Sequence, residues 1–217
     1  MMVMSLKYSN KHLYDAIEHM LQGLCYWMGY RMECYSAHSI MESAAVDVAM
    51  SIINARLDHR TYVVKMEYPY SKMGLSGSRE RADLVVLTKR DKELIPECVL
   101  EFKMANSANE GVWGDIKKLN DIPLPITRLA ILLSRCNPNI IGDFVDNIGG
   151  INERAKRKVD SPQNDKRIPV RVVFVKKAME SQNTESPFRA ICVELDNRQN
   201  LANSEVVARN ETDLSQN

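Results

Sequence analysis

The sequence has almost no net charge. Its 29 lysine and arginine residues are matched by 28 aspartate and glutamate residues, which leaves a formal charge of +1 at pH 7. The chain as a whole therefore has no electrostatic bias toward nucleic acid or a membrane surface, and any binding of a polyanion must come from a local patch. No stretch approaches the roughly 18 apolar residues of a membrane-spanning helix, and the N-terminus lacks the apolar core of a signal peptide. We expect a cytoplasmic protein without a membrane partner.

Paired cysteines are also lacking. The five cysteines, at positions 25, 34, 98, 136 and 192, form no Cys-x-x-Cys pair and have no histidine at metal-ligand spacing. An odd number of cysteines without a secretion signal favours reduced thiols. The sequence has no glycine-rich phosphate loop with its lysine and no Ser-His-Asp or Cys-His pattern. These absences argue against a disulfide scaffold, a cysteine-ligated zinc site, a P-loop nucleotide site and serine or cysteine hydrolase chemistry.

What the sequence does contain is a series of helix and strand patterns in a globular composition, 45% hydrophobic and 26% charged. Apolar residues recur at spacings of three and four over residues 8–34 and 39–57, which predicts two helices. Ser39 and Glu42 fit a capping box at the start of the second helix. A further helix is expected at 109–120, a short one at 138–149 and a polar, basic loop at 151–167.

Strand patterns fill most of the remaining chain. Runs of β-branched, aromatic and aliphatic residues predict strands at 61–68, 82–88, 97–103, 127–135, 170–175 and 188–195. A central mixed β-sheet flanked by helices buries these runs best, so we expect the α/β class. We expect an N-terminal helical region at 1–38, one domain at 39–195 and a polar, loosely ordered tail at 196–217.

Three charged residues mark the ends of two strands that otherwise read as core. Asp83 opens the apolar run Leu84–Leu87, while Glu101 and Lys103 end the run that follows. Side chains alternate along a strand, so Glu101 and Lys103 share one face. If the two strands pair as an antiparallel hairpin, Asp83 lies near both. Two carboxylates and an ammonium group then converge at one end of the sheet.

This trio is suited to metal-dependent chemistry. Two carboxylates, the main-chain carbonyl of Phe102 and water molecules are ligands for a hard cation such as Mg²⁺. The cation lowers the pKa of a bound water molecule and offsets charge that grows on a phosphate oxygen. Lys103 is able to hold the phosphate or to orient and deprotonate the water. Together these are the minimal groups for phosphodiester hydrolysis.

Asp83 in RADLVV, with Glu101, Phe102 and Lys103 in VLEFK, resembles the motif of the PD-(D/E)XK nuclease superfamily, which has the restriction-endonuclease-like fold. The resemblance covers roughly residues 39–135 and the closing strands. It implies an α-β-β-β-α-β core, Asp83 and Glu101 as ligands of Mg²⁺ or Mn²⁺, and Lys103 as the catalytic lysine. The spacing alone is weak, and Ala82 stands where the motif has proline. The predicted element order around it adds the specificity.

Many members of this superfamily carry a further glutamate upstream. Two residues compete for that role, Glu42 at the start of a predicted helix and Glu67 near the end of the first predicted strand. The sequence favours Glu42 as a catalytic residue, with Glu67 as the alternative metal ligand.

The resemblance implies a DNA endonuclease acting in restriction, phage defence or DNA repair, as a homodimer or with a partner protein. Its candidate DNA-binding residues are Arg81, Lys117, Lys118, Arg154, Lys156, Arg157 and Lys158. Each of these cations has an ordinary alternative as a solvated surface charge. The alternative for the whole chain is a catalytically silent nuclease-like fold that serves as a subunit binding nucleic acid or protein.

Overall fold

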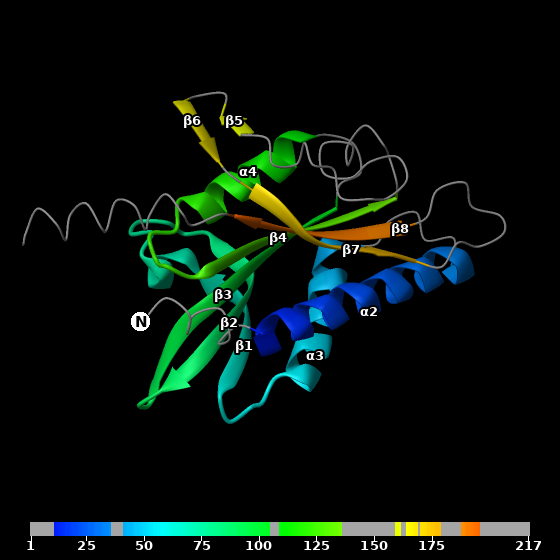
Figure 1. Cartoon of the computed structure of the whole chain (residues 1–217), viewed down its shortest axis with the longest axis horizontal. Helices are drawn as coiled ribbons and strands as arrows, with labels where there is room; N and C mark the ends of the chain where they lie inside the picture. Colours follow the sequence, from blue (N-terminus) through cyan, green and yellow to red (C-terminus); the bar gives the residue numbers. More distant parts are fainter. Residues whose placement is uncertain are drawn as a thin grey trace, which may run out of the picture.

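The computed structural model describes residues 11–35, 41–104, 109–135, 159–161, 164–168, 170–178 and 188–195. These residues form a six-stranded sheet in the order β1-β2-β3-β4-β8-β7 and a separate pair of strands, β5 and β6 (Figure 1). The sheet is mixed, with helices against both faces. The predicted α/β class is therefore confirmed.

The order of the elements follows the predicted one. The helices are α2 (Lys11–Tyr35), α3 (Glu42–Arg56), the 3₁₀ helix η1 (Tyr70–Met73) and α4 (Asn109–Asn120). The strands are β1 (Tyr62–Pro69), β2 (Arg81–Arg90), β3 (Glu93–Met104), β4 (Thr127–Arg135), β5 (Val159–Ser161), β6 (Asn164–Ile168), β7 (Val170–Lys177) and β8 (Phe188–Leu195). The expected loop at 151–167 is wrong in part, because β5 and most of β6 lie there. The expected helix at 138–149 lies outside the described residues.

Strands β1, β2 and β3 form an antiparallel meander, and β3 then pairs in parallel with β4 through the crossover helix α4. The β2–β3 turn consists of Asp91 and Lys92, whose positive φ angles of 46° and 75° fit a two-residue hairpin. This tight turn makes both strands longer than the sequence predicts. Leu84 pairs with Leu100, so the start of β2 lies beside the end of β3.

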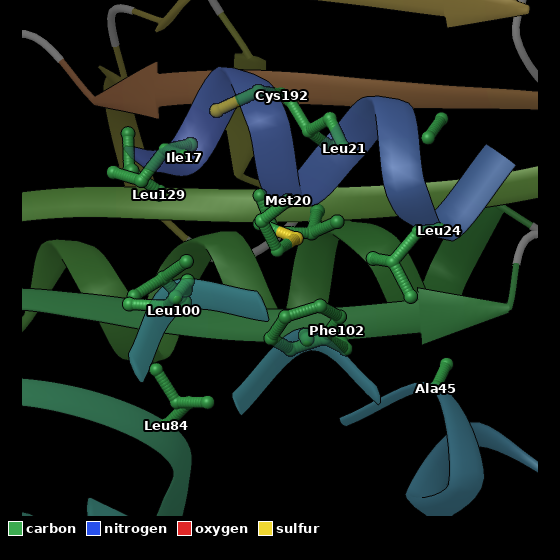
Figure 2. Close-up of a cluster of buried hydrophobic side chains, with 14 of the residues drawn as sticks. Ile17, Met20, Leu21, Leu24, Ala45, Leu84, Leu100, Phe102, Leu129 and Cys192 are labelled. Atoms are coloured by element: carbon green, nitrogen blue, oxygen red, sulfur yellow. The ribbon is translucent and has the colours of Figure 1, made fainter. Parts of the chain in front are cut away.

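Helices α2 and α3 cover one face of the sheet with an apolar core (Figure 2). The apolar stripe of α2 predicted from its spacing is buried there. The labelled side chains of this core are Ile17, Met20, Leu21, Leu24, Ala45, Leu84, Leu100, Phe102, Leu129 and Cys192. None of the helices in the described part of the chain is both long and apolar enough to cross a membrane.

Helix α4 covers the opposite face. Val112, Ile116 and Leu119 pack there against strand residues that include Val85 and Val99. Alternation along β3 sends Leu100 and Phe102 to the α2–α3 face, so Glu101 and Lys103 point to the face covered by α4. Glu101 and Lys103, near the end of β3, therefore lie on the face of the sheet that α4 covers.

The predicted capping box is wrong. Met41 is the N-cap residue of α3 and makes no side-chain capping hydrogen bond, while Ser39 lies outside the described residues. Glu42 instead accepts a hydrogen bond at 3.0 Å from the main-chain N–H of Met104, at the end of β3. A long-range bond to the last residue of β3 has replaced the local cap, and it links α3 to the sheet beside Lys103.

Candidate active site

Asp83 and Glu101 meet at the open end of the β2–β3 hairpin. Asp83 Oδ2 accepts a hydrogen bond at 2.8 Å from the main-chain N–H of Phe102. This bond holds the carboxylate across the strand pair and next to Glu101. Glu101 is 7% exposed, and its Oε1 accepts a hydrogen bond from the Tyr70 hydroxyl group.

Burial raises the pKa of Glu101 to about 9, and the charge of Asp83 contributes in the same direction. A hydrogen bond between the two acid side chains raises it further, whereas the bond from Tyr70 lowers it. Without a cation, this raised pKa favours the protonated form of Glu101 at neutral pH. Burial, followed by the charge of Glu101, also raises the pKa of Tyr70, which remains a hydroxyl donor.

Lys103 lies two residues along β3, between acids from two helices. Its Nζ is 3.5 Å from Asp115 Oδ2 on α4 and 3.9 Å from Glu42 Oε2 on α3. The Lys103 side chain is 34% exposed, so it reaches both acids while remaining open to solvent. The site thus gathers Asp83, Glu101 and Lys103 from the hairpin, with one further acid from each flanking helix.

The two candidates for the further glutamate are separated by the structure. Glu42 contacts Lys103 and the end of β3, as described above. Glu67 is exposed and has a φ of 51°, which interrupts the regular pairing of β1 with β2 at the position opposite Asp83. Within the described residues, no side-chain hydrogen bond or ion pair joins Glu67 to Asp83, Glu101 or Lys103. Glu42 is the one that the fold brings to the site.

Two of the candidate DNA-binding cations, Arg81 and Lys118, already contact other groups of the protein. Arg81 Nη1 donates to the Glu67 carbonyl at 2.9 Å. Lys118 Nζ lies 3.4 Å from Asp115 Oδ1 and 3.6 Å from Glu80 Oε2. Burial by itself lowers the pKa of Lys118, but the charges of Asp115 and Glu80 outweigh it and raise that pKa.

The remaining candidate cations are Lys117 and a basic cluster further along the chain. Lys117 is exposed on α4. The basic cluster Arg154, Lys156, Arg157 and Lys158 lies outside the described residues.

The residues fit a divalent cation held by two carboxylates. In the described ranges, no group of three or more His, Cys, Asp and Glu residues has the arrangement of a metal site. Asp83 and Glu101 remain as the acidic pair, and the Phe102 carbonyl as a further ligand stays a prediction. Their donor atoms are hard oxygens, as Mg²⁺ requires, and Mg²⁺ usually keeps several waters as its other ligands. Burial, followed by the charge of Asp83, raises the pKa of Glu101, and a bound cation would favour the charged form of both acids.

Two contacts of this site were not predicted from the sequence. Tyr70 lies between the strands predicted at 61–68 and 82–88, and the signal for its burial is an aromatic residue directly after Pro69. Asp115 lies in the helix predicted at 109–120. Its spacing of three from Lys118 indicates that pair, but not its contact with Lys103.

Comparison with protein-family models, curated proteins and solved structures gives no match in any of the three. The site is therefore interpreted from its own geometry and chemistry.

Proposed function

We propose that the chain is a Mg²⁺- or Mn²⁺-dependent endonuclease of the PD-(D/E)XK type, which hydrolyses phosphodiester bonds in DNA. The observation that carries the proposal is the convergence of Asp83, Glu101 and Lys103 at the open end of one hairpin. The order α3-β1-β2-β3-α4-β4 around this end agrees with the core that the sequence resemblance implies.

The functional group of each residue determines its proposed role in the reaction. Asp83 and Glu101, with the Phe102 carbonyl, would hold the cation. When bound, the cation acidifies a water molecule and offsets charge on the phosphate. Lys103 donates to a phosphate oxygen or orients the attacking water, and Glu42 and Asp115 keep its ammonium group at the site. In the reaction the water molecule loses a proton as its oxygen bonds to phosphorus, the P–O ester bond breaks, and the departing oxygen takes a proton.

The partners and setting of this activity belong to the same proposal. One site of this kind cuts one strand, so a homodimer or a partner protein would be needed to cut a duplex. Exposed Lys117 is one contact for the DNA backbone, and the basic cluster at 154–158 is expected to add others. Restriction, phage defence and DNA repair are the roles that this chemistry serves.

A specific observation favours the alternative, a silent nuclease-like fold that binds nucleic acid or protein. The charged groups already satisfy one another. Glu101 has hydrogen bonds with Tyr70 and Asp83, and Lys103 lies between Asp115 and Glu42. Glu101 and Lys103 therefore each have a protein partner without a cation. The presence of both acids and the lysine still favours the enzyme.

Cleavage of supercoiled plasmid DNA with Mg²⁺, with Mn²⁺ and with a chelator tests the proposal. Cutting is expected only with the cation, and Asp83→Asn and Lys103→Ala should each reduce its rate by roughly 10²-fold or more. Asp47→Asn and Lys65→Ala change the same residue types at exposed positions and serve as matched controls. Cation-dependent cutting that survives both site substitutions would overturn the assignment. Failure to cut DNA or RNA, together with no cation binding, supports the silent alternative.

A further inference from the structure

Tyr70 reaches the acid pair from outside the six-stranded sheet. It lies in η1, on the connection between β1 and β2, and only 1% of its surface is exposed. Its hydroxyl group donates to Glu101 Oε1. The side chain of Glu101 also shares a hydrogen bond with Asp83. One carboxyl group is therefore held from two directions, by a neighbouring acid and by a buried phenol.

The main chain around Tyr70 fixes its position independently of Glu101. Tyr70 N–H donates to the Glu80 carbonyl at 3.2 Å, and the Tyr70 carbonyl accepts from Leu75 N–H at 3.2 Å. The helix ends at Gly74, whose φ is 94°. A Cβ at Gly74 would lie 2.5 Å from Pro123 Cγ, so the connection packs tightly on the segment between α4 and β4.

We propose that Tyr70 is a positioning residue that holds Glu101 in the orientation needed to share a cation with Asp83. This inference rests on the proposed function. A carboxylate that binds a cation keeps a defined orientation when another donor hydrogen-bonds to it, and loss of such a partner typically weakens metal binding by about 10–100-fold. Tyr70 is the side chain outside the acid pair that supplies this donor, and it comes from a separately anchored element.

The competing explanation is that Tyr70 only fills the core under α4, where Met73, Ile116 and Leu119 also lie. Tyr70→Phe separates the two explanations because it keeps the ring and removes the hydroxyl group. Tyr14→Phe is a matched control. The Tyr14 hydroxyl donates at 2.7 Å to Glu194 Oε1, so this variant loses the same kind of bond between α2 and β8.

Binding of Mn²⁺ to the full chain, measured by titration calorimetry, is the direct test. Tyr70→Phe should weaken binding by about 10-fold or more, and Tyr14→Phe should leave it within about twofold, since few distant surface contacts couple to a site. Tyr70→Phe should also raise the Mn²⁺ concentration for half-maximal cleavage more than it lowers the maximal rate. If the variant is less stable, the increase in its melting temperature with Mn²⁺ reports the same affinity.

The outcomes separate the two hypotheses. Unchanged Mn²⁺ affinity in Tyr70→Phe, with weakened binding in Asp83→Asn, overturns the role of Tyr70 and leaves the proposed function standing. Equal weakening in Tyr70→Phe and Tyr14→Phe also overturns it, because the effect is then not local to the site. If the unchanged chain neither binds Mn²⁺ nor cuts nucleic acid, the proposed function fails, and this inference fails with it.

Discussion

Two glutamates on β3, only four residues apart, are in different chemical surroundings. Each accepts a hydrogen bond from a hydroxyl group, Glu97 from Thr88 and Glu101 from Tyr70. Glu97 is half-buried at a position where the β2–β3 register shifts, toward the closed end of the hairpin. Glu101 is buried at the open end. The hydroxyl contact is common to both, so it does not by itself mark a site.

The difference lies in the other neighbours. Beside Glu97 lie Tyr62 and Cys98, whose pKa values are raised first by burial and then by nearby charges that include Glu97. Beside Glu101 there are two acids, Asp83 and Asp115, which both raise its pKa. A lone carboxylate with a hydroxyl donor is a satisfied structural group. Clustered carboxylates with a lysine are under electrostatic stress that a cation would relieve, and this is what sets the open end apart.

The largest expected effect is on catalysis. Glu101→Gln keeps the size and hydrogen-bonding shape of the protonated acid but removes a ligand for the cation. We expect it to lower the rate of Mg²⁺-dependent DNA cleavage by on the order of 10²-fold or more. Glu97→Gln, made on the same strand, should change the rate less than about twofold, in keeping with substitutions away from a site. A rate loss in Glu97→Gln as large as that in Glu101→Gln would remove the distinction between the two ends.

The next effect is on the pH dependence of stability. Because the pKa of Glu101 rises to about 9 from the ordinary value of 4.5, the folded chain binds a proton that the unfolded chain has already released. Its contribution to the free energy of unfolding is therefore complete below pH 4.5 and is lost as the pH rises toward 9. The slope is at most about 1.4 kcal/mol per pH unit for one proton.

Urea unfolding between pH 5 and pH 9, without a divalent cation, measures this slope. Glu101→Gln has no titrating group at this position. The stability of this variant should therefore fall less with pH than that of the unchanged chain. The variant should be more stable than the unchanged chain at pH 8 by about 1 kcal/mol or more. Glu97→Gln is expected to keep the original slope. Parallel slopes for all three proteins would contradict the buried, protonated state of Glu101.

Another effect on stability concerns the connection between β1 and β2, which positions Tyr70 beside Glu101. Thr88 comes from β2 itself, whereas Tyr70 depends on a connection that ends at a left-handed glycine. Gly74→Ala places a Cβ at a φ of 94° and 2.5 Å from Pro123 Cγ, so we expect a loss of about 2–4 kcal/mol from backbone strain and overlap together. Gly77 also has a positive φ, of 81°, but has nothing within 4 Å of the added Cβ.

Gly77→Ala is therefore the matched control, with an expected loss of about 1–2 kcal/mol from the backbone alone. Thermal unfolding of both variants measures the difference. Equal losses would mean that contact with Pro123 does not hold the connection in place.

The sequence predicted the open end of the hairpin because that end depends on local rules. Alternation along a strand puts Glu101 and Lys103 on one face, and antiparallel pairing brings Asp83 beside them. The convergence of Asp83 with Glu101 is therefore present in the structure as expected. The class of the fold followed from the same strand and helix patterns, because continuous apolar strands need helices on both faces of the sheet.

The contacts that the sequence did not predict are those made between distant elements. In the sequence, Glu42 matches a local capping-box pattern. In the structure, it instead accepts a hydrogen bond from Met104, 62 residues away. Asp115 reaches Lys103 because the crossover after β3 returns α4 over this end of the sheet. Tyr70 depends on how one connection packs against another. Residue spacing and secondary-structure propensity do not predict contacts between distant elements. The hairpin is therefore predictable from the sequence, whereas the contacts of Glu42, Asp115 and Tyr70 with it are not.

The smallest expected effect is at the closed end. Thr88→Val keeps the branched shape and strand propensity of the side chain and removes the hydroxyl donor of Glu97. Glu97 is half-buried, so water is able to replace the lost bond, and we expect a loss of only about 0.5–1 kcal/mol in the free energy of unfolding. Mn²⁺ affinity should stay unchanged in the same variant.

Tyr70→Phe removes the corresponding bond at a buried acid, where water cannot take its place, so its cost should be larger, about 1–3 kcal/mol. Urea unfolding of the two variants at pH 7 compares the ends directly. A larger loss of stability for Thr88→Val than for Tyr70→Phe would show that Glu97, not Glu101, depends more on its hydroxyl partner.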